Sequence, residues 1–112
     1  MLPAAKQLLW VMLVLILSAL LEAGGDAGMR FGIRGKPVGF LAGGLSLVAY
    51  GLIVNLPKWD FGRLLGVYIA VFFIVSQLIA VVLFKERIGL PILVGGALIV
   101  AGGAVLALWH PE

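Results

Sequence analysis

Four long apolar stretches constrain this sequence more than any other feature. They cover residues 8–23, 38–56, 64–84 and 90–109. A bilayer hydrocarbon core about 30 Å thick is crossed by about 20 helical residues. Lipid offers no hydrogen-bonding partners to the backbone, so only helices and closed barrels cross it. The third and fourth stretches lack the alternating polar face of barrel strands, and the pattern therefore predicts transmembrane helices.

The composition agrees with a membrane protein and excludes several other classes. Hydrophobic residues make up 63% of the 112-residue chain and charged residues only 12%, against about 25% charged residues in soluble domains. The absence of cysteine excludes disulfides and thiolate metal sites. A net charge of +3 without a dense basic patch argues against a nucleic-acid partner and favours contact with the lipid bilayer.

The predicted fold is all-α, a single transmembrane domain over residues 1–112 that forms a four-helix bundle. Short polar segments separate the apolar stretches, and connections this short place consecutive helices antiparallel. Both termini then lie on the same side of the membrane. The predicted helices cover about residues 5–32, 38–56, 62–84 and 90–109.

The basic residues encode the orientation only weakly. Five of them fall on the side of the first and third loops, namely Arg30, Arg34, Lys36, Lys85 and Arg87. Three fall on the side of the termini, namely Lys6, Lys58 and Arg63. The excess mildly favours cytoplasmic first and third loops. A bias this small permits insertion in both orientations.

Glu22 is the first candidate for chemistry. If its helix stops at Ala23, Glu22 lies among the lipid headgroups. If the helix continues to Arg30, Glu22 lies well inside the membrane, where carboxylates are costly and usually functional. Asp26 follows one turn later on the same face. The two could form a paired proton site, or Asp26 could lie at the membrane surface and pair with Arg30.

A few other polar side chains could contribute to binding. Tyr68 could donate a hydrogen bond to a carboxylate or stack on a substrate, or it could be an interfacial aromatic residue. Arg63 opens the third helix, and Ser18 lies one turn before Glu22. In the second helix, Tyr50 shares a face with Ser46, and such groups often serve only interhelical hydrogen bonding.

The fourth helix carries small residues at regular spacings. Gly95 and Gly102 share one face, as do Gly96 and Gly103, while Ala97 and Ala101 lie four residues apart. Small residues let membrane helices approach closely. We expect a dimer interface at Gly95, Ala97, Ala101 and Gly102, although packing within one chain would require the same residues.

Catalytic signatures are missing from the sequence. The one histidine is His110, next to the C-terminus, so no histidine triad or metal cluster is expected. Glycine-rich stretches lie inside apolar runs, where they cannot act as phosphate loops. We therefore expect no enzyme activity, no metal and no cofactor.

Several segments together resemble the small multidrug resistance family of the drug/metabolite transporter superfamily. Residues 22–31 resemble its first-helix pattern of an essential Glu, a Gly three residues later, then Met, a basic residue and Phe. Residues 84–91 resemble the loop before its last helix, and residues 98–102 resemble its dimerisation motif. Residues 61–68 look more like the YnfA branch. The family's third-helix signature is missing, and Asp26 occupies a position that is usually uncharged.

The resemblance implies a proton-coupled exporter that works as an antiparallel homodimer in a bacterial inner membrane. A cationic or amphipathic substrate would compete with protons for a site shared by two Glu22 residues, with the proton gradient as energy source. Four short helices enclose little volume, whereas two copies can enclose a cavity. The alternatives are half of a heterodimeric lipid-carrier or polyamine transporter, paired with a paralogue, and a structural membrane protein without transport.

Overall fold

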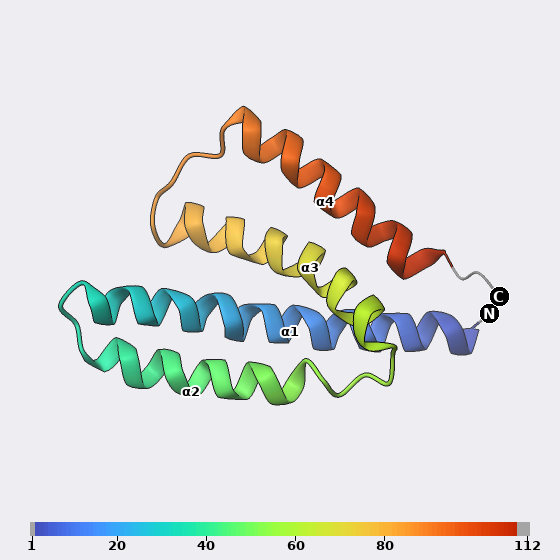
Figure 1. The fold of residues 1–112 in the computed structure, drawn as a ribbon, viewed down its shortest axis with the longest axis horizontal. Helices are drawn as coiled ribbons and strands as arrows, with labels where there is room; N and C mark the ends of the chain where they lie inside the picture. Colours follow the sequence, from blue (N-terminus) through green and yellow to red (C-terminus); the bar gives the residue numbers. More distant parts are fainter. Residues whose placement is uncertain (1, 110–112) are drawn as a thin grey trace. The chain divides into compact units, whose positions relative to one another are not determined.

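The chain folds into helices throughout, as the sequence predicts. The computed structural model describes residues 2–109, with side chains from residue 5 onward, and this part of the chain contains no strand. Its helices are α1 (Leu2–Ile33), α2 (Val38–Ile53), α3 (Phe61–Val82) and α4 (Leu90–Leu108), drawn in Figure 1. The chain divides into two compact units, Met1–Lys58 and Trp59–Glu112. Each unit is a hairpin of two helices.

Three of the helices are long and apolar enough to cross a membrane, as expected of a multi-pass membrane protein. The apolar spans are Ala5–Ile33 in α1, Phe61–Val82 and Leu90–Leu108. Their outer surfaces carry large hydrophobic side chains, and Leu98 in α4, for example, is 71% exposed. Exposed apolar surface on this scale marks contact with lipid or with another protein.

The second helix is shorter than the predicted span of residues 38–56. It ends at Ile53 after 16 residues, about 24 Å of helix at 1.5 Å per residue. Pro57 disfavours helical backbone at the residue before it. Upstream of it, the Asn55 side-chain amide donates a hydrogen bond to the Gly51 carbonyl, at 2.8 Å, and satisfies a group that the helix end leaves open.

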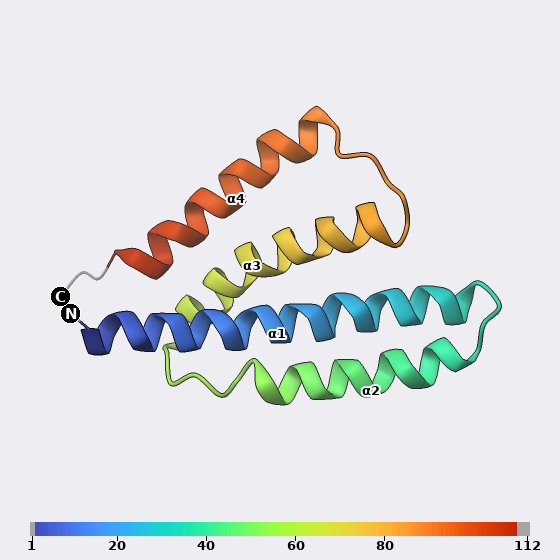
Figure 2. The ribbon, with the colours of Figure 1, turned by 180° about the vertical axis from the view of Figure 1, so that it is seen from behind.

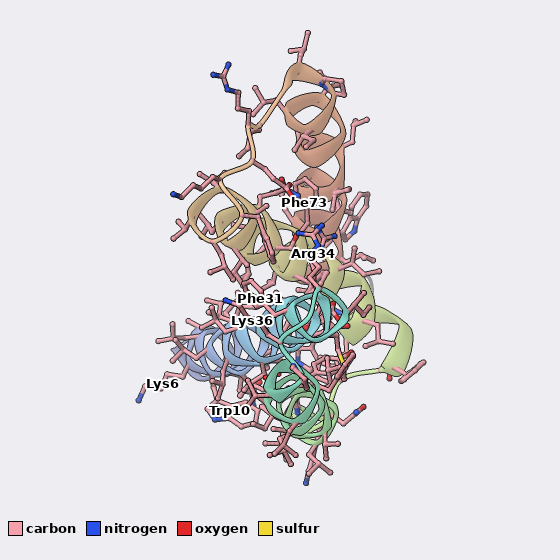
Figure 3. All side chains as sticks on the ribbon, turned by 90° about the vertical axis from the view of Figure 1, so that its left-hand side faces the viewer. Lys6, Trp10, Phe31, Arg34, Lys36 and Phe73 are labelled. Atoms are coloured by element: carbon pink, nitrogen blue, oxygen red, sulfur yellow. The ribbon has the colours of Figure 1, made fainter. Side chains whose placement is uncertain are left out.

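A glycine cap ends α1 and turns the chain into α2. Gly35 has a φ of 102°, a conformation that costs a residue with a Cβ about 1–2 kcal/mol. The Lys36 amide donates to the Phe31 carbonyl and the Gly35 amide to the Gly32 carbonyl, which is the Schellman pattern. Figure 3 shows Lys36 beside Phe31 at this turn, and the Lys36 ammonium lies 6.0 Å from the centre of the Phe31 ring.

Glycines bring the backbones of α1 and α2 into direct contact near this turn. A Cβ added at Gly28 would lie 2.9 Å from the Gly43 Cα. A Cβ added at Gly39 would collide with the Gly28 carbonyl oxygen, and one at Gly43 would lie 2.6 Å from the Gly25 carbonyl oxygen. Both helices therefore present a groove rather than a ridge, and their axes approach more closely than side chains would allow.

In the second hairpin, α3 and α4 pack against each other through small residues and one aromatic ring. A Cβ added at Gly103 would collide with the Ala70 Cβ, and one added at Gly66 would lie 2.5 Å from the Leu106 side chain. Nearer the connecting loop, the Phe73 ring fills the space over Gly96. Figures 1 and 2 both show α3 and α4 diverging towards this loop.

The turn after α3 contains a strained residue. α3 ends at Val82, two residues before the predicted end at residue 84. Lys85 has a φ of 56°, which is uncommon for a residue other than glycine. The Glu86 amide then donates to the Ala80 carbonyl at 3.0 Å. This bond closes the end of the helix and redirects the chain towards α4.

Replacing Gly28 with Ala should weaken the first hairpin, because the new methyl group meets backbone atoms that cannot rotate away. We expect a loss of about 1–3 kcal/mol, the usual cost of overpacking. Gly24→Ala, one turn earlier with open space around its Cβ position, is the matched control. It should be neutral or stabilising by up to about 1 kcal/mol. Reversible unfolding in detergent measures both, and equal losses would contradict the packing described above.

Candidate functional site

Glu22 lies within a continuous helix. α1 runs unbroken from Leu2 to Ile33, so the carboxylate does not stand at a helix end, as it would if the helix stopped at Ala23. Glu22 precedes the last residue of the helix by eleven positions, or about 16 Å along the axis. The three glycines that follow it do not break the helix, because Gly25 and Gly28 are held against α2.

Polar groups of α2 lie opposite this part of α1. The Ser46 hydroxyl donates a 2.6 Å hydrogen bond to the carbonyl of Leu21, the residue before Glu22. One turn later on the same face, the Tyr50 hydroxyl is within electrostatic reach of both carboxylates, Glu22 and Asp26. We call Glu22, Asp26, Ser46 and Tyr50 the α1–α2 polar cluster.

The members of this cluster differ in exposure. Glu22, Ser46 and Tyr50 are half-buried, whereas Asp26 is exposed. A half-buried carboxylate within electrostatic reach of a phenol can attract a cation, and a phenol can donate a hydrogen bond to a carboxylate. Asp26 adds a second negative charge about 6 Å further along the helix. The first hairpin thus brings together Glu22, Asp26 and Tyr50 of the predicted binding residues.

Ser18, another of the predicted binding residues, lies inside the first hairpin. Its side chain is fully buried, and its hydroxyl donates to the Val14 carbonyl of its own helix at 2.8 Å. This bond satisfies the hydroxyl locally, as serines in membrane helices often do. A role for Ser18 in binding stays a prediction.

The remaining predicted binding residues, Arg63 and Tyr68, lie in the second hairpin. Arg63 joins the start of α3 to the end of α4: its guanidinium donates to the Leu106 carbonyl at 2.9 Å and to the Ala107 carbonyl at 3.1 Å. A cation at a helix C-terminus is favourable because carbonyl oxygens gather there. Tyr68 is buried, and its ring packs at a tilt against Phe72 with centroids 5.9 Å apart. Substrate contacts by either residue stay predictions.

The small residues of α4 divide into packed and open ones. Gly96 and Gly103 are buried and face α3. Cβ positions at Gly95 and Gly102 meet nothing within 4 Å, and Ala97 and Ala101 are exposed. At 100° per residue, Gly95 and Ala97 lie to opposite sides of Gly96. The four predicted interface residues therefore form two open faces rather than one seam.

The sequence also contains a pattern that indicates the close contact between α1 and α2. Residues 28–32 and 39–43 each have the form Gly-x-x-x-Gly, which marks close helix–helix contact. These two motifs account for the contact between α1 and α2 that supports the polar cluster.

Among the described residues, no three His, Cys, Asp or Glu side chains gather where they could hold a metal ion. His110 lies outside the described residues.

Comparison with known proteins gives no assignment: no family model, curated protein or solved structure matches this chain.

Ser46→Ala should destabilise the first hairpin because it removes the hydroxyl that bonds to the Leu21 carbonyl. Such bonds between membrane helices contribute about 0.6 kcal/mol on average. Ser76→Ala is the control, because the Ser76 hydroxyl bonds only to the Phe73 carbonyl of its own helix. Unfolding in detergent should show a larger loss for Ser46→Ala. Equal effects would show that the Ser46 bond does not hold the helices together.

Proposed function

We propose that this protein is a proton-coupled exporter of cationic or amphipathic compounds, with Glu22 as the carboxylate for which proton and substrate compete. The observation that carries the proposal is the position of Glu22 in an unbroken apolar helix, half-buried and next to Leu21, the residue whose carbonyl accepts the Ser46 hydrogen bond from α2. The family resemblance of residues 22–31 supports the same role.

The depth of Glu22 in the membrane supports this role. When the turn between α1 and α2 lies at the membrane surface, a carboxylate about 16 Å along the helix lies near the middle of a core about 30 Å thick. An acidic residue in such a place is costly, and in membrane proteins it commonly marks an ion or proton pathway.

The exchange of a proton for a cationic substrate at Glu22 keeps the charge of the site balanced. A protonated Glu22 is neutral, and a cationic substrate that binds beside it replaces the positive charge of the departing proton. Tyr50 can donate a hydrogen bond to the ionised carboxylate, and Asp26 strengthens the attraction for a cation. If the site opens alternately to each side of the membrane, substrate leaves the cell as protons enter.

A dimer can enclose a substrate cavity, whereas the four short helices of one chain enclose little volume. Two copies in opposite orientations would place two Glu22 carboxylates around one cavity. The count of five basic residues against three is compatible with insertion both ways. Of the two open faces of α4, we assign the interface to Gly95 and Gly102, since glycine permits the closer approach.

Glu22→Gln should abolish substrate-induced proton release and proton-driven export, because the amide keeps the size and polarity of Glu22 but cannot ionise. Glu22→Asp should keep part of the activity, and Asp26→Asn should leave reduced transport. Proton release from detergent-purified protein and flux in liposomes measure these effects, with a panel of cationic, guanidinium and polyamine compounds as substrates.

Glu86→Gln is the matched control for Glu22→Gln. Glu86 lies in the turn after α3 and is exposed, so the same loss of a carboxylate there should leave coupling intact. Coupling of wild-type strength in Glu22→Gln would refute the mechanism. Complete loss in Asp26→Asn, in protein that still folds, would make Asp26 a primary ligand.

Gly102→Leu should prevent dimer formation and leave the second hairpin intact, because the position is open and lies away from α3. Gly51→Leu in α2 makes the same change at another open position, and should leave the dimer unaffected. Cross-linking in membranes reports assembly. Labelling of a cysteine at position 36 in cells tests orientation, since access from only one side would exclude an antiparallel homodimer.

A further inference from the structure

Gln77 lies on the face of α3 that packs against α4. It follows Ala70 by seven residues, a spacing that keeps two side chains on one face of a helix. On α4, Gly96 precedes Gly103 by the same seven residues, and Gly103 packs directly against Ala70. Because α3 and α4 run antiparallel (Figure 1), Gln77 and Gly96 stand at the same level on facing sides of the hairpin.

The Gln77 carboxamide makes no hydrogen bond to any residue that the structure describes. The side chain is half-buried, and its polar atoms stay accessible. Gln77 lies about 24 Å from the start of α3 and about 7.5 Å from its end at Val82. Helical side chains point towards the N-terminus of their helix, so the carboxamide is directed back into the hydrocarbon core. An amide left without a partner there is costly.

The Phe73 ring occupies the place over Gly96 that this register gives to Gln77. A Cβ added at Gly96 would lie 2.5 Å from a carbon of that ring. Beyond the ring, α3 and α4 diverge towards the connecting loop, as Figures 1 and 2 show. One turn further along, Val81 and Ile92 continue the two facing sides and are 39% and 36% exposed. The ring thus holds α4 away from the carboxamide.

We propose that the loop-side half of this hairpin, residues 73–96, switches between two arrangements. In the observed one, the Phe73 ring fills the space over Gly96 and the helices diverge. In the other, the ring turns aside, α4 closes onto α3, and the Gln77 amide donates a hydrogen bond to an α4 backbone carbonyl beside Gly96. Each arrangement satisfies a contact that the other leaves open.

The build of the hairpin permits this closure. A helical carbonyl that already accepts one hydrogen bond has a second lone pair, and glycine leaves the backbone around it uncovered. The contact between Ala70 and Gly103 is tight enough to act as the pivot. Residues 83–89 between the helices are not helical, so they can follow the movement. The switch does not depend on the exporter proposal, because it involves no residue of the α1–α2 polar cluster.

A pair of cysteines measures closure directly, because the natural chain contains none. Val81→Cys and Ile92→Cys place one thiol on each facing side at the same level, one turn nearer the loop than Gln77 and Gly96. A disulfide needs Cα atoms within about 7 Å of each other, so oxidation of the full-length protein in liposomes traps the closed arrangement. Mass spectrometry distinguishes a disulfide within one chain from one between two copies.

Three variants of the double-cysteine protein test the parts of the switch. Gln77→Leu keeps a side chain of similar size that cannot form hydrogen bonds. It should slow disulfide formation about threefold, the factor that an average hydrogen bond between membrane helices contributes. Phe73→Ala removes the ring and should accelerate disulfide formation. Ser76→Ala is the matched control and should leave the rate unchanged, because the Ser76 hydroxyl already bonds to the Phe73 carbonyl.

Other results overturn the proposal. Circular dichroism checks that each variant is helical, and Gln77→Leu decides the outcome if Phe73→Ala does not fold. An unchanged rate in folded Gln77→Leu shows that the carboxamide does not hold α4, and an unchanged rate in folded Phe73→Ala shows that the ring does not keep it away. Equal slowing in Ser76→Ala shows a general response to lost polarity. A disulfide found only between two copies, or in no variant, shows that the hairpin does not close.

Discussion

Direct contact between the backbones of α1 and α2 is the constraint on which the candidate site depends. In lipid, apolar side chains gain little by leaving one apolar surface for another, so helix pairs are held by close packing and polar bonds. Gly28, Gly39 and Gly43 allow that close packing. The Ser46 bond to the Leu21 carbonyl, at 2.6 Å, is possible only because the helices approach this closely.

This contact also determines the surroundings of Glu22. Three glycines soon after an acidic residue would favour a helix end in an exposed segment, since glycine weakens helices by up to about 1 kcal/mol each. Here Gly25 and Gly28 pack against α2 instead, and α1 continues to Ile33. The carboxylate consequently stands within the helix, with Tyr50 in electrostatic reach.

The second hairpin is organised by the Arg63 charge at its open end and by the Phe73 ring further along the two helices. Arg63 ties α3 to the last carbonyls of α4, while Phe73 keeps the helices apart towards the connecting loop. Satisfying the terminal carbonyls is a general need of helices that end near lipid. A single arginine meets that need for the carbonyls of Leu106 and Ala107.

The sequence by itself determined the all-α fold, the number of helices and their approximate ends, because apolar runs of this length in a chain with few charges admit few other structures. It also singled out Glu22, since an acidic residue after a long apolar run is rare. The end of α2 at Ile53 was predicted three residues too late, although Pro57 and the short polar segment before it offered the signal.

Only the tertiary structure decided which of several equivalent small residues pack inside a hairpin. Gly96 and Gly103 face α3 whereas Gly95 and Gly102 are open, yet both pairs have the same spacing, so periodicity cannot distinguish them. Likewise, the sequence around Arg63, at the start of α3, does not indicate which groups its side chain bonds to. Its bonds to Leu106 and Ala107 join residues more than forty positions apart, and such contacts depend on how two helices are placed in space rather than on any local pattern.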